Sequence, residues 1–341
     1  MLMREESRRR AVRERGTGAA SLAIVACLGI APIAACSGGR AGRAVGSDMR
    51  ASCNAAVVTR DAFVSFARHA DGKTSSVVRQ FWDGGDAQKV QIDGLVYAMT
   101  ATDDAVYVAK DDGVYRLRDG RVTRILRAQA RALVARDGSI FYADDSTGDL
   151  HELRDDGDRV IVREAPGEPG GLLVTGGLLY WKEHHMRVPD IEDTRRDVIW
   201  RVPVVGGEAE AVASVPGAIG AYCVRGKSVV FVDRGVPRDR LPELDDTRLV
   251  VVDPDGTQRA YPLPSEDIGG LAVDDAFAYL AAGQRIIRVD TSTGNIEDVA
   301  PAPDHGGVIS VDETHVFSVD EHDQLVRVAR PAREGASARP R

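Results

Sequence analysis

Residues 269–300 of the chain read GGLAVDDAFAYLAAGQRIIRVDTSTGNIEDVA. Two glycines open an apolar run, an acidic pair ends it, and a second apolar run follows around Tyr279. A third run places an arginine between apolar neighbours, and a shorter fourth run closes the stretch. Short runs with alternating apolar positions are typical of β-strands, and breaks rich in Gly, Asp and Ser are typical of tight turns. The stretch therefore predicts four short strands joined by turns.

The same pattern recurs seven times after residue 50, each time with an aromatic residue in its second strand. These aromatic residues are Phe66, Tyr107, Tyr142, Tyr180, Phe231, Tyr279 and Phe317. From Tyr107 to Phe317, five intervals cover 210 residues, a mean period of 42, which is typical of four-stranded blades around an axis. We predict an all-β fold, a β-propeller of seven four-stranded blades preceded by a signal peptide, with the aromatic residues filling the core. Six or eight blades remain possible, because the interval from Tyr180 to Phe231 is 51 residues.

The charge balance argues against nucleic acid as a partner. The 341 residues include 44 Lys and Arg against 52 Asp and Glu, a net charge of -8. Residues 1–35 hold six arginines and three glutamates, so the rest of the chain carries a net charge of about −11. A surface of that sign repels phosphate backbones.

The beginning of the chain reads as a targeting signal. An arginine-rich segment precedes the apolar stretch 21–33, which is too short to span a bilayer as a helix. The sequence IAAC at 33–36 resembles the lipobox of bacterial lipoproteins. That resemblance implies removal of residues 1–35, acylation of Cys36 and a lipid-anchored protein of the bacterial cell envelope, with Ser37 compatible with sorting to the outer membrane. An ordinary secretory signal cleaved near the same point and an uncleaved short anchor are the alternatives.

The rest of the chain divides into three parts. Residues 36–50 form a tether, residues 51–330 form the propeller, and residues 331–341, rich in Gly, Ala, Ser and Pro, form a disordered tail. The last repeat contains only three strands, and an open sheet edge promotes aggregation. We therefore expect residues 44–50 to be able to supply the missing outer strand.

Two cysteines, Cys53 and Cys223, fall within the propeller. They belong to repeats that are far apart in the chain, and a disulfide requires Cα atoms within about 7 Å of one another. We expect two buried thiols rather than a disulfide.

The repeats also resemble known propeller sequences. An acidic turn, an aromatic strand and an apolar–Arg–apolar strand, as in residues 269–300 and again in 306–328, are similar to repeats of the NHL, YWTD and TolB-like families of exported bacterial proteins. The resemblance covers residues 54–330 and implies the fold but no particular activity. The YWTD tetrad, the kelch pattern and a regular Trp-Asp ending are absent from the sequence.

Two repeats depart from the pattern by long insertions between their second and third strands. The insertions span residues 182–197 and 233–247 and lie in consecutive repeats, so their loops should emerge side by side on one face. We predict a partner-binding rim there, and the alternative is a pair of solvated hairpins. The predicted binding residues are His184, His185, Arg187, Asp190, Glu192, Arg238, Asp239, Arg240 and Glu243.

Signatures of catalysis and metal binding are weak. Adjacent histidines on a strand point to opposite faces, so His184 and His185 are not expected to share an ion. The acidic segments 144–149 and 320–323 lack the spaced ligands of a calcium loop and are interpreted as turns. No G-x-S-x-G or P-loop motif occurs in the sequence. We predict no catalytic residue, no metal site and no cofactor.

These observations favour a non-catalytic scaffold, tethered to the membrane by lipid, that binds an envelope protein or an extracellular small molecule or glycan through its loop-rich face. The alternative is a lactonase-like hydrolase or lyase with a metal at the mouth of the channel. Its candidate residues are Asn54, Glu168, Asp267, Asp304 and His305.

Overall fold

A computed structural model describes most of the chain after residue 55. The described ranges are 56–58, 62–68, 73–81, 86–102, 104–184, 196–235, 247–264, 267–302, 309–311, 314–319 and 325–331. Within these ranges the secondary structure consists of strands, without a helix that has the length and apolar character to cross a membrane.

The strands form seven antiparallel sheets, which we number as blades in chain order. Blade 1 consists of β1 (Ala56–Val58), β2 (Ala62–Arg68), β3 (Thr74–Phe81) and β4 (Gln88–Asp93), and blade 2 of β5 (Ala98–Ala101), β6 (Val106–Lys110), β7 (Gly113–Arg118) and β8 (Arg121–Leu126). Blade 3 consists of β9 (Ala130–Arg136), β10 (Ser139–Asp144), β11 (Leu150–Arg154) and β12 (Gly157–Val162), and blade 4 of β13 (Glu168–Thr175), β14 (Leu178–His184), β15 (Arg196–Pro203) and β16 (Glu210–Pro216). Blade 5 consists of β17 (Ile219–Arg225), β18 (Ser228–Asp233), β19 (Arg248–Val252) and β20 (Gln258–Pro262), and blade 6 of β21 (Ile268–Val273), β22 (Phe277–Ala282), β23 (Arg285–Asp290) and β24 (Ile296–Pro301). Blade 7 consists of β25 (Ile309–Val311), β26 (His315–Val319) and β27 (Leu325–Ala329).

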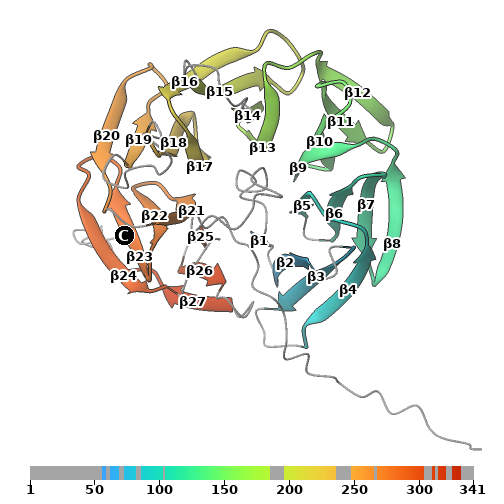
Figure 1. Ribbon diagram of the computed structural model, residues 1–341, viewed down its shortest axis with the longest axis horizontal. Coiled ribbons are helices and arrows are strands. Elements are labelled where there is room, and N and C mark those ends of the chain that lie inside the picture. The colour runs from blue at the N-terminus through green and yellow to red at the C-terminus, as the bar shows by residue number, and fades with distance from the viewer. Residues whose placement is uncertain are drawn as a thin grey trace, which may run out of the picture. The chain divides into compact units, whose positions relative to one another are not determined.

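The seven blades follow one another around a central axis (Figure 1). The first strand of each blade is innermost, and successive first strands from β1 to β25 contact each other in chain order. This arrangement confirms the predicted seven-bladed β-propeller. Six blades have four strands, and blade 7 has three among the described residues.

Among the described residues, the core contains six apolar clusters, one at each seam between consecutive blades from 1 to 7. Most of the predicted aromatic residues belong to these clusters: Tyr180 and Phe231, for example, are fully buried between blades 4 and 5. Tyr107 is partly buried against the cluster between blades 2 and 3, and Phe317 is buried in blade 7. A blade packs against a neighbour on each of its two faces, which explains why polar residues of the third strand are also enclosed. Arg288 of β23 is buried, and its guanidinium stacks on Phe277 and pairs with Glu297.

Arginine side chains tie neighbouring blades together. Arg159 of blade 3 donates to the carbonyl oxygen of Val204 in blade 4 over 2.9 Å. Arg225 of blade 5 donates to the carbonyl oxygen of Asp275 in blade 6 over 2.7 Å. Each of these bonds satisfies a turn carbonyl of the next blade, so the ring is held by polar links as well as by its core.

The last described residues, Arg330 and Pro331, contact blade 6. The backbone N–H of Arg330, directly after β27, donates to the carbonyl oxygen of Thr314 over 2.8 Å, and its guanidinium pairs with Asp274 in the turn between β21 and β22. Arg288 donates to the carbonyl oxygen of Pro331 over 3.2 Å. These contacts fix the last described strand to its neighbour. The closing strand predicted at residues 44–50 lies outside the described residues, as does the tail after Pro331.

Cys223 is a free thiol on β17. It is partly buried beside the cluster between blades 5 and 6, and its sulfur lies 3.1 Å from the carbonyl oxygen of Leu271. Cys53 lies outside the described residues.

Candidate functional site

One face of the ring carries the connections between second and third strands, at the end where the inner strands begin. We call it the hairpin face. In blades 2, 3 and 6 these connections comprise residues 111–112, 145–149 and 283–284. In blades 4 and 5 they comprise residues 185–195 and 234–247. The two long connections therefore arise from neighbouring blades on the same face, as the sequence predicted.

The stem of the blade 4 hairpin is fixed by buried charged residues. Lys182 of β14 is 3% exposed, and its Nζ donates to the carbonyl oxygen of Ile219 in blade 5 over 2.8 Å. The next residue, Glu183, is also buried and accepts a hydrogen bond of 2.8 Å from the indole N–H of Trp200. That indole stacks against Trp181, with ring centroids 6.4 Å apart. The two strands that carry this hairpin are therefore linked to each other and to the next blade.

The stem of the blade 5 hairpin is built in a similar way. Asp233 of β18 is 1% exposed and accepts hydrogen bonds from the N–H of Gly235 at 2.9 Å and from Nη2 of Arg248 at 2.7 Å. Because Arg248 begins β19, this ion pair joins the two sides of the hairpin. Arg234 donates to the carbonyl oxygen of Ile268 in blade 6 over 2.9 Å. Buried ionic groups require such partners, because an unpaired buried charge is strongly destabilising.

The seam between these two stems has additional links. The N–H of Ile219 donates to Asp197, near the start of β15, over 2.8 Å. Arg196 forms a parallel bridge with Gly217. Gly220 leaves room for the neighbouring hairpin stem, because a Cβ at this position would lie 2.9 Å from Nε of Arg234. The bases of both hairpins thus share a single network across blades 4 and 5.

The stem residues were not predicted as functional from the sequence. Lys182 and Asp233 were assigned to the insertions, but nothing marked them as buried. A charged residue directly after a run of buried apolar residues, as in LLYWKE at 178–183, is the signal that could have identified them.

The predicted binding residues belong to the connections themselves. His184 is the last residue of β14, where its backbone pairs in register with Glu168. The other predicted residues lie outside the described residues: His185, Arg187, Asp190, Glu192, Arg238, Asp239, Arg240 and Glu243. The rim therefore stays a prediction, and the structure supplies the stems on which it would be carried.

The candidates for a metal-dependent site at the channel mouth are dispersed. Glu168 pairs with Arg131 of blade 3, which also contacts Asp145 at 2.7 Å. The carbonyl oxygen of Asp267 accepts a hydrogen bond from the N–H of Gly283. The remaining candidates, Asn54, Asp304 and His305, lie outside the described residues. In the part of the chain that is described, no group of three His, Cys, Asp or Glu side chains is placed to hold a metal ion.

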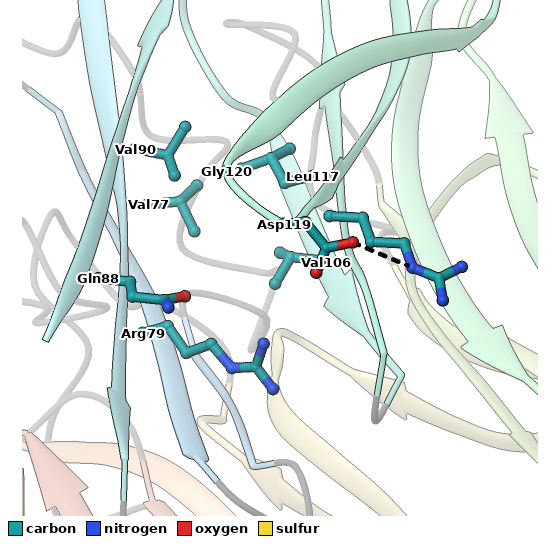
Figure 2. A pocket seen from close by; sticks show the side chains of 9 residues that line it. Val77, Arg79, Gln88, Val90, Val106, Leu117, Asp119 and Gly120 are labelled. Atoms are coloured by element: carbon teal, nitrogen blue, oxygen red, sulfur yellow. Dashed lines mark ion pairs between the residues drawn. The ribbon is translucent and has the colours of Figure 1, made fainter. Parts of the chain in front are cut away.

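A small cleft lies at the seam between blades 1 and 2 (Figure 2). It is lined by Val77, Arg79, Gln88, Val90, Val106, Leu117, Arg118, Asp119 and Gly120. Its volume of about 40 Å³ has room for a few water molecules, whereas ligand pockets usually enclose roughly 300–1,000 Å³. The cleft is therefore not a candidate for an organic ligand.

Comparison with known proteins identifies the fold but assigns the chain to no family. No family model matches the chain, and no curated protein matches it. The β-propeller domain of Myceliophteria thermophila Cps50 (Swd1) matches with a TM-score of 0.53 and 13% identity, covering 82% of this chain and 96% of that domain. The computationally designed protein Ika8 matches with a TM-score of 0.52 and 12% identity, covering 82% and 97%. Similarity at this level shows a shared β-propeller fold and carries no activity with it.

Proposed function

We propose that the chain is a lipid-anchored β-propeller scaffold of the cell envelope that binds its ligand through the hairpins of blades 4 and 5. The observation that carries the proposal is the pair of long connections on one face of neighbouring blades, each held by a stem with a buried charged residue that is hydrogen-bonded. Binding residues are commonly found on loops that a rigid scaffold positions. Because the stems are fixed, such loops would lose less conformational entropy when they bind a ligand.

The composition of the two connections indicates the kind of ligand. Residues 185–195 and 236–246 combine His, Arg, Asp and Glu with Met, Val, Leu and Pro. A surface that mixes charged groups of both signs with apolar groups suits a protein partner, which presents both kinds of group over a large area. We therefore favour an envelope protein over a small molecule or a glycan.

The proposed location at a membrane rests on the sequence at residues 33–36. Acylation of Cys36 would hold the propeller at a membrane without a spanning helix. Metabolic labelling with a palmitate analogue tests it: the wild-type chain should be labelled and the Cys36→Ser variant should not. Labelling that persists in the variant, or is absent from both, would contradict the proposed anchor.

The binding proposal is tested by crosslinking in intact cells followed by mass spectrometry. One variant replaces residues 186–194 and 236–245 by short Gly-Asn turns and leaves both stems intact. Its matched control carries alanine at exposed charged residues in turns of the opposite face, namely Asp137, Lys227 and Asp275. The hairpin variant should lose the crosslinked partner, and the control should retain it. A partner that crosslinks equally to both variants would rule out the hairpins as the binding surface.

A further inference from the structure

The outermost strand of blade 2 is basic, although the protein is acidic overall. β8 reads RVTRIL, and its first four residues are exposed. Arg127 follows the strand and is exposed as well. From the start of β8 to Arg127 the chain has three arginines and no acidic residue. No acidic residue occurs in β8 itself, whereas β24, the outermost strand of blade 6, carries Glu297 and Asp298.

Part of this positive charge is not neutralised by neighbouring groups. Arg124 contacts Asp112 at 3.5 Å, and both side chains are substantially exposed. Arg121 and Arg127, in contrast, form no ion pair with any residue that the structure describes. The edge of blade 2 therefore presents two exposed guanidinium groups that are free to bind anions, with a third that is only weakly paired.

An exposed apolar residue lies within the same strip. Val122 is 42% exposed and shares one face of β8 with Arg124, two residues further along the strand. Arginine beside an exposed apolar side chain suits the boundary of an anionic bilayer, because the guanidinium can pair with lipid phosphates while the apolar group enters the headgroup region.

The position of the strip in the ring is consistent with a membrane contact. Blade 2 adjoins blade 1, where the chain enters the propeller, and blade 5 lies across the axis from them (Figure 1). The segment from Cys36 to Ala56 spans at most about 70 Å when fully extended. An anchor at Cys36 would therefore keep the ring within that distance of the lipid surface, which the edge of blade 2 can then reach.

We propose that the edge of blade 2, formed by Arg121, Val122, Arg124 and Arg127, binds the anionic phospholipid surface to which the chain is tethered. The inference rests on the proposed lipid anchor, because a tether is what keeps the edge near the bilayer. The net negative charge of the protein does not prevent this contact, because charges farther away than about 10 Å are largely screened at 0.1 M salt.

The test is co-sedimentation with lipid vesicles. The protein used is the chain from Ser37 onward, which keeps all seven blades and all six core clusters and lacks any acyl group. It should bind vesicles that contain phosphatidylglycerol, should bind pure phosphatidylcholine vesicles much more weakly, and should be released from the anionic vesicles at 0.5 M salt. One basic residue at an anionic surface is worth roughly five-fold in affinity. The double variant Arg121→Glu, Arg127→Glu should therefore bind at least about 30-fold more weakly.

A matched control separates this edge from overall charge. The double variant Arg163→Glu, Lys227→Glu makes the same change in net charge at exposed positions of blades 3 and 5, and it should bind within about three-fold of the unmodified chain. Circular dichroism should show that both variants remain folded. Equal weakening by the two variants, equal binding to both kinds of vesicle, or binding to a soluble polyanion such as heparin without binding to vesicles would overturn the proposal. Because no acyl group is present in this assay, its result is independent of the palmitate test of Cys36.

Discussion

The ion pair between Arg330 and Asp274 should be one of the contacts in the ring whose loss lowers stability most. Their side chains are 16% and 10% exposed, so the ion pair is largely removed from water. Asp274 also accepts hydrogen bonds from the N–H groups of Ala276 and Phe277 at 2.7 and 2.8 Å and from the hydroxyl of Tyr279 at 3.1 Å. The pair therefore joins the end of blade 7 to a tightly organised turn in blade 6.

Replacing either partner should lower the free energy of unfolding. Arg330→Met keeps most of the side-chain volume and removes the charge, which should cost about 2 kcal/mol, as expected for the loss of a charged hydrogen-bond donor. Asp274→Ala removes the acceptor for two backbone amides together with the carboxylate partner of Arg330, which should cost about 3–5 kcal/mol. With roughly 2–4 °C per kcal/mol for a domain of this order of size, Arg330→Met should lower Tm by about 4–8 °C.

The loss of stability caused by Arg330→Met should become smaller at low pH. Burial alone would raise the pKa of Asp274, but the amides of Ala276 and Phe277, together with Arg330 and Tyr279, hold this pKa below its ordinary value. A lowered pKa contributes stability above the ordinary aspartate pKa of about 3.9, and that stability is lost as the pH falls through the folded-state value. The difference in Tm between the wild type and Arg330→Met should therefore be full at pH 6 and shrink below about pH 4.

Differential scanning calorimetry of both single variants and the double variant provides the assay. The two positions should be coupled by more than 0.5 kcal/mol, because each single variant already removes the contact between them. Arg285→Met is the control, since its pair with Asp298 is mostly exposed and should contribute at most about 1 kcal/mol. Additive effects of Arg330→Met and Asp274→Ala, or a shift no larger than that of the control, would refute this account of how the last described strand is held to blade 6.

Three further substitutions test the interior of the ring. Lys182→Met should lower the free energy of unfolding by about 1–3 kcal/mol in urea titrations, because the carbonyl oxygen of Ile219 loses a buried donor; an unchanged midpoint would mean that this donor is dispensable. Gly113→Ala should cost a few kcal/mol and reduce soluble yield, because a Cβ there overlaps the carbonyl oxygen of Leu126 and φ is +148°; normal yield and Tm would contradict this. Glu152→Gln should destabilise near neutral pH and much less near pH 3, measured by thermal melts, because burial tends to raise the pKa of this carboxyl but hydrogen bonds from two arginines and a serine lower it below its usual value.

The sequence predicted the architecture well because the repeated residues are those that fill the core. An aromatic residue such as Tyr180 or Phe231 recurs in each second strand, and these positions are buried between blades. The number of blades followed from counting these residues, and the inflated interval between Tyr180 and Phe231 correctly located the long connection in blade 4.

The polar links between blades could not be predicted in the same way. Arg159 reaches the carbonyl oxygen of Val204, 45 residues away, and Lys182 reaches that of Ile219, 37 residues away. A backbone carbonyl is present at every residue, so the identity of the acceptor residue carries no signal in the sequence. Only the three-dimensional neighbourhood of the donor selects the acceptor, and single-sequence patterns do not contain that information.

The third strands illustrate another limit. Alternation correctly placed apolar neighbours on one side of Arg288 and the arginine on the other. In an isolated sheet that second side would face water, but in a ring it faces the next blade. The burial of Arg288 is therefore a consequence of closure, which is a property of the whole chain rather than of one repeat.

The buried stems of blades 4 and 5 make the protein a candidate framework for engineering. Lys182 and Asp233 form hydrogen bonds with groups outside the long connections or at their very base, such as Ile219 and Arg248. We therefore expect that the residues between the stems can be exchanged for foreign sequences while these stem contacts are kept. A library built between positions 186 and 194 and between 236 and 245 would thus vary recognition while the supporting structure stays constant, as variable loops do on a conserved antibody domain.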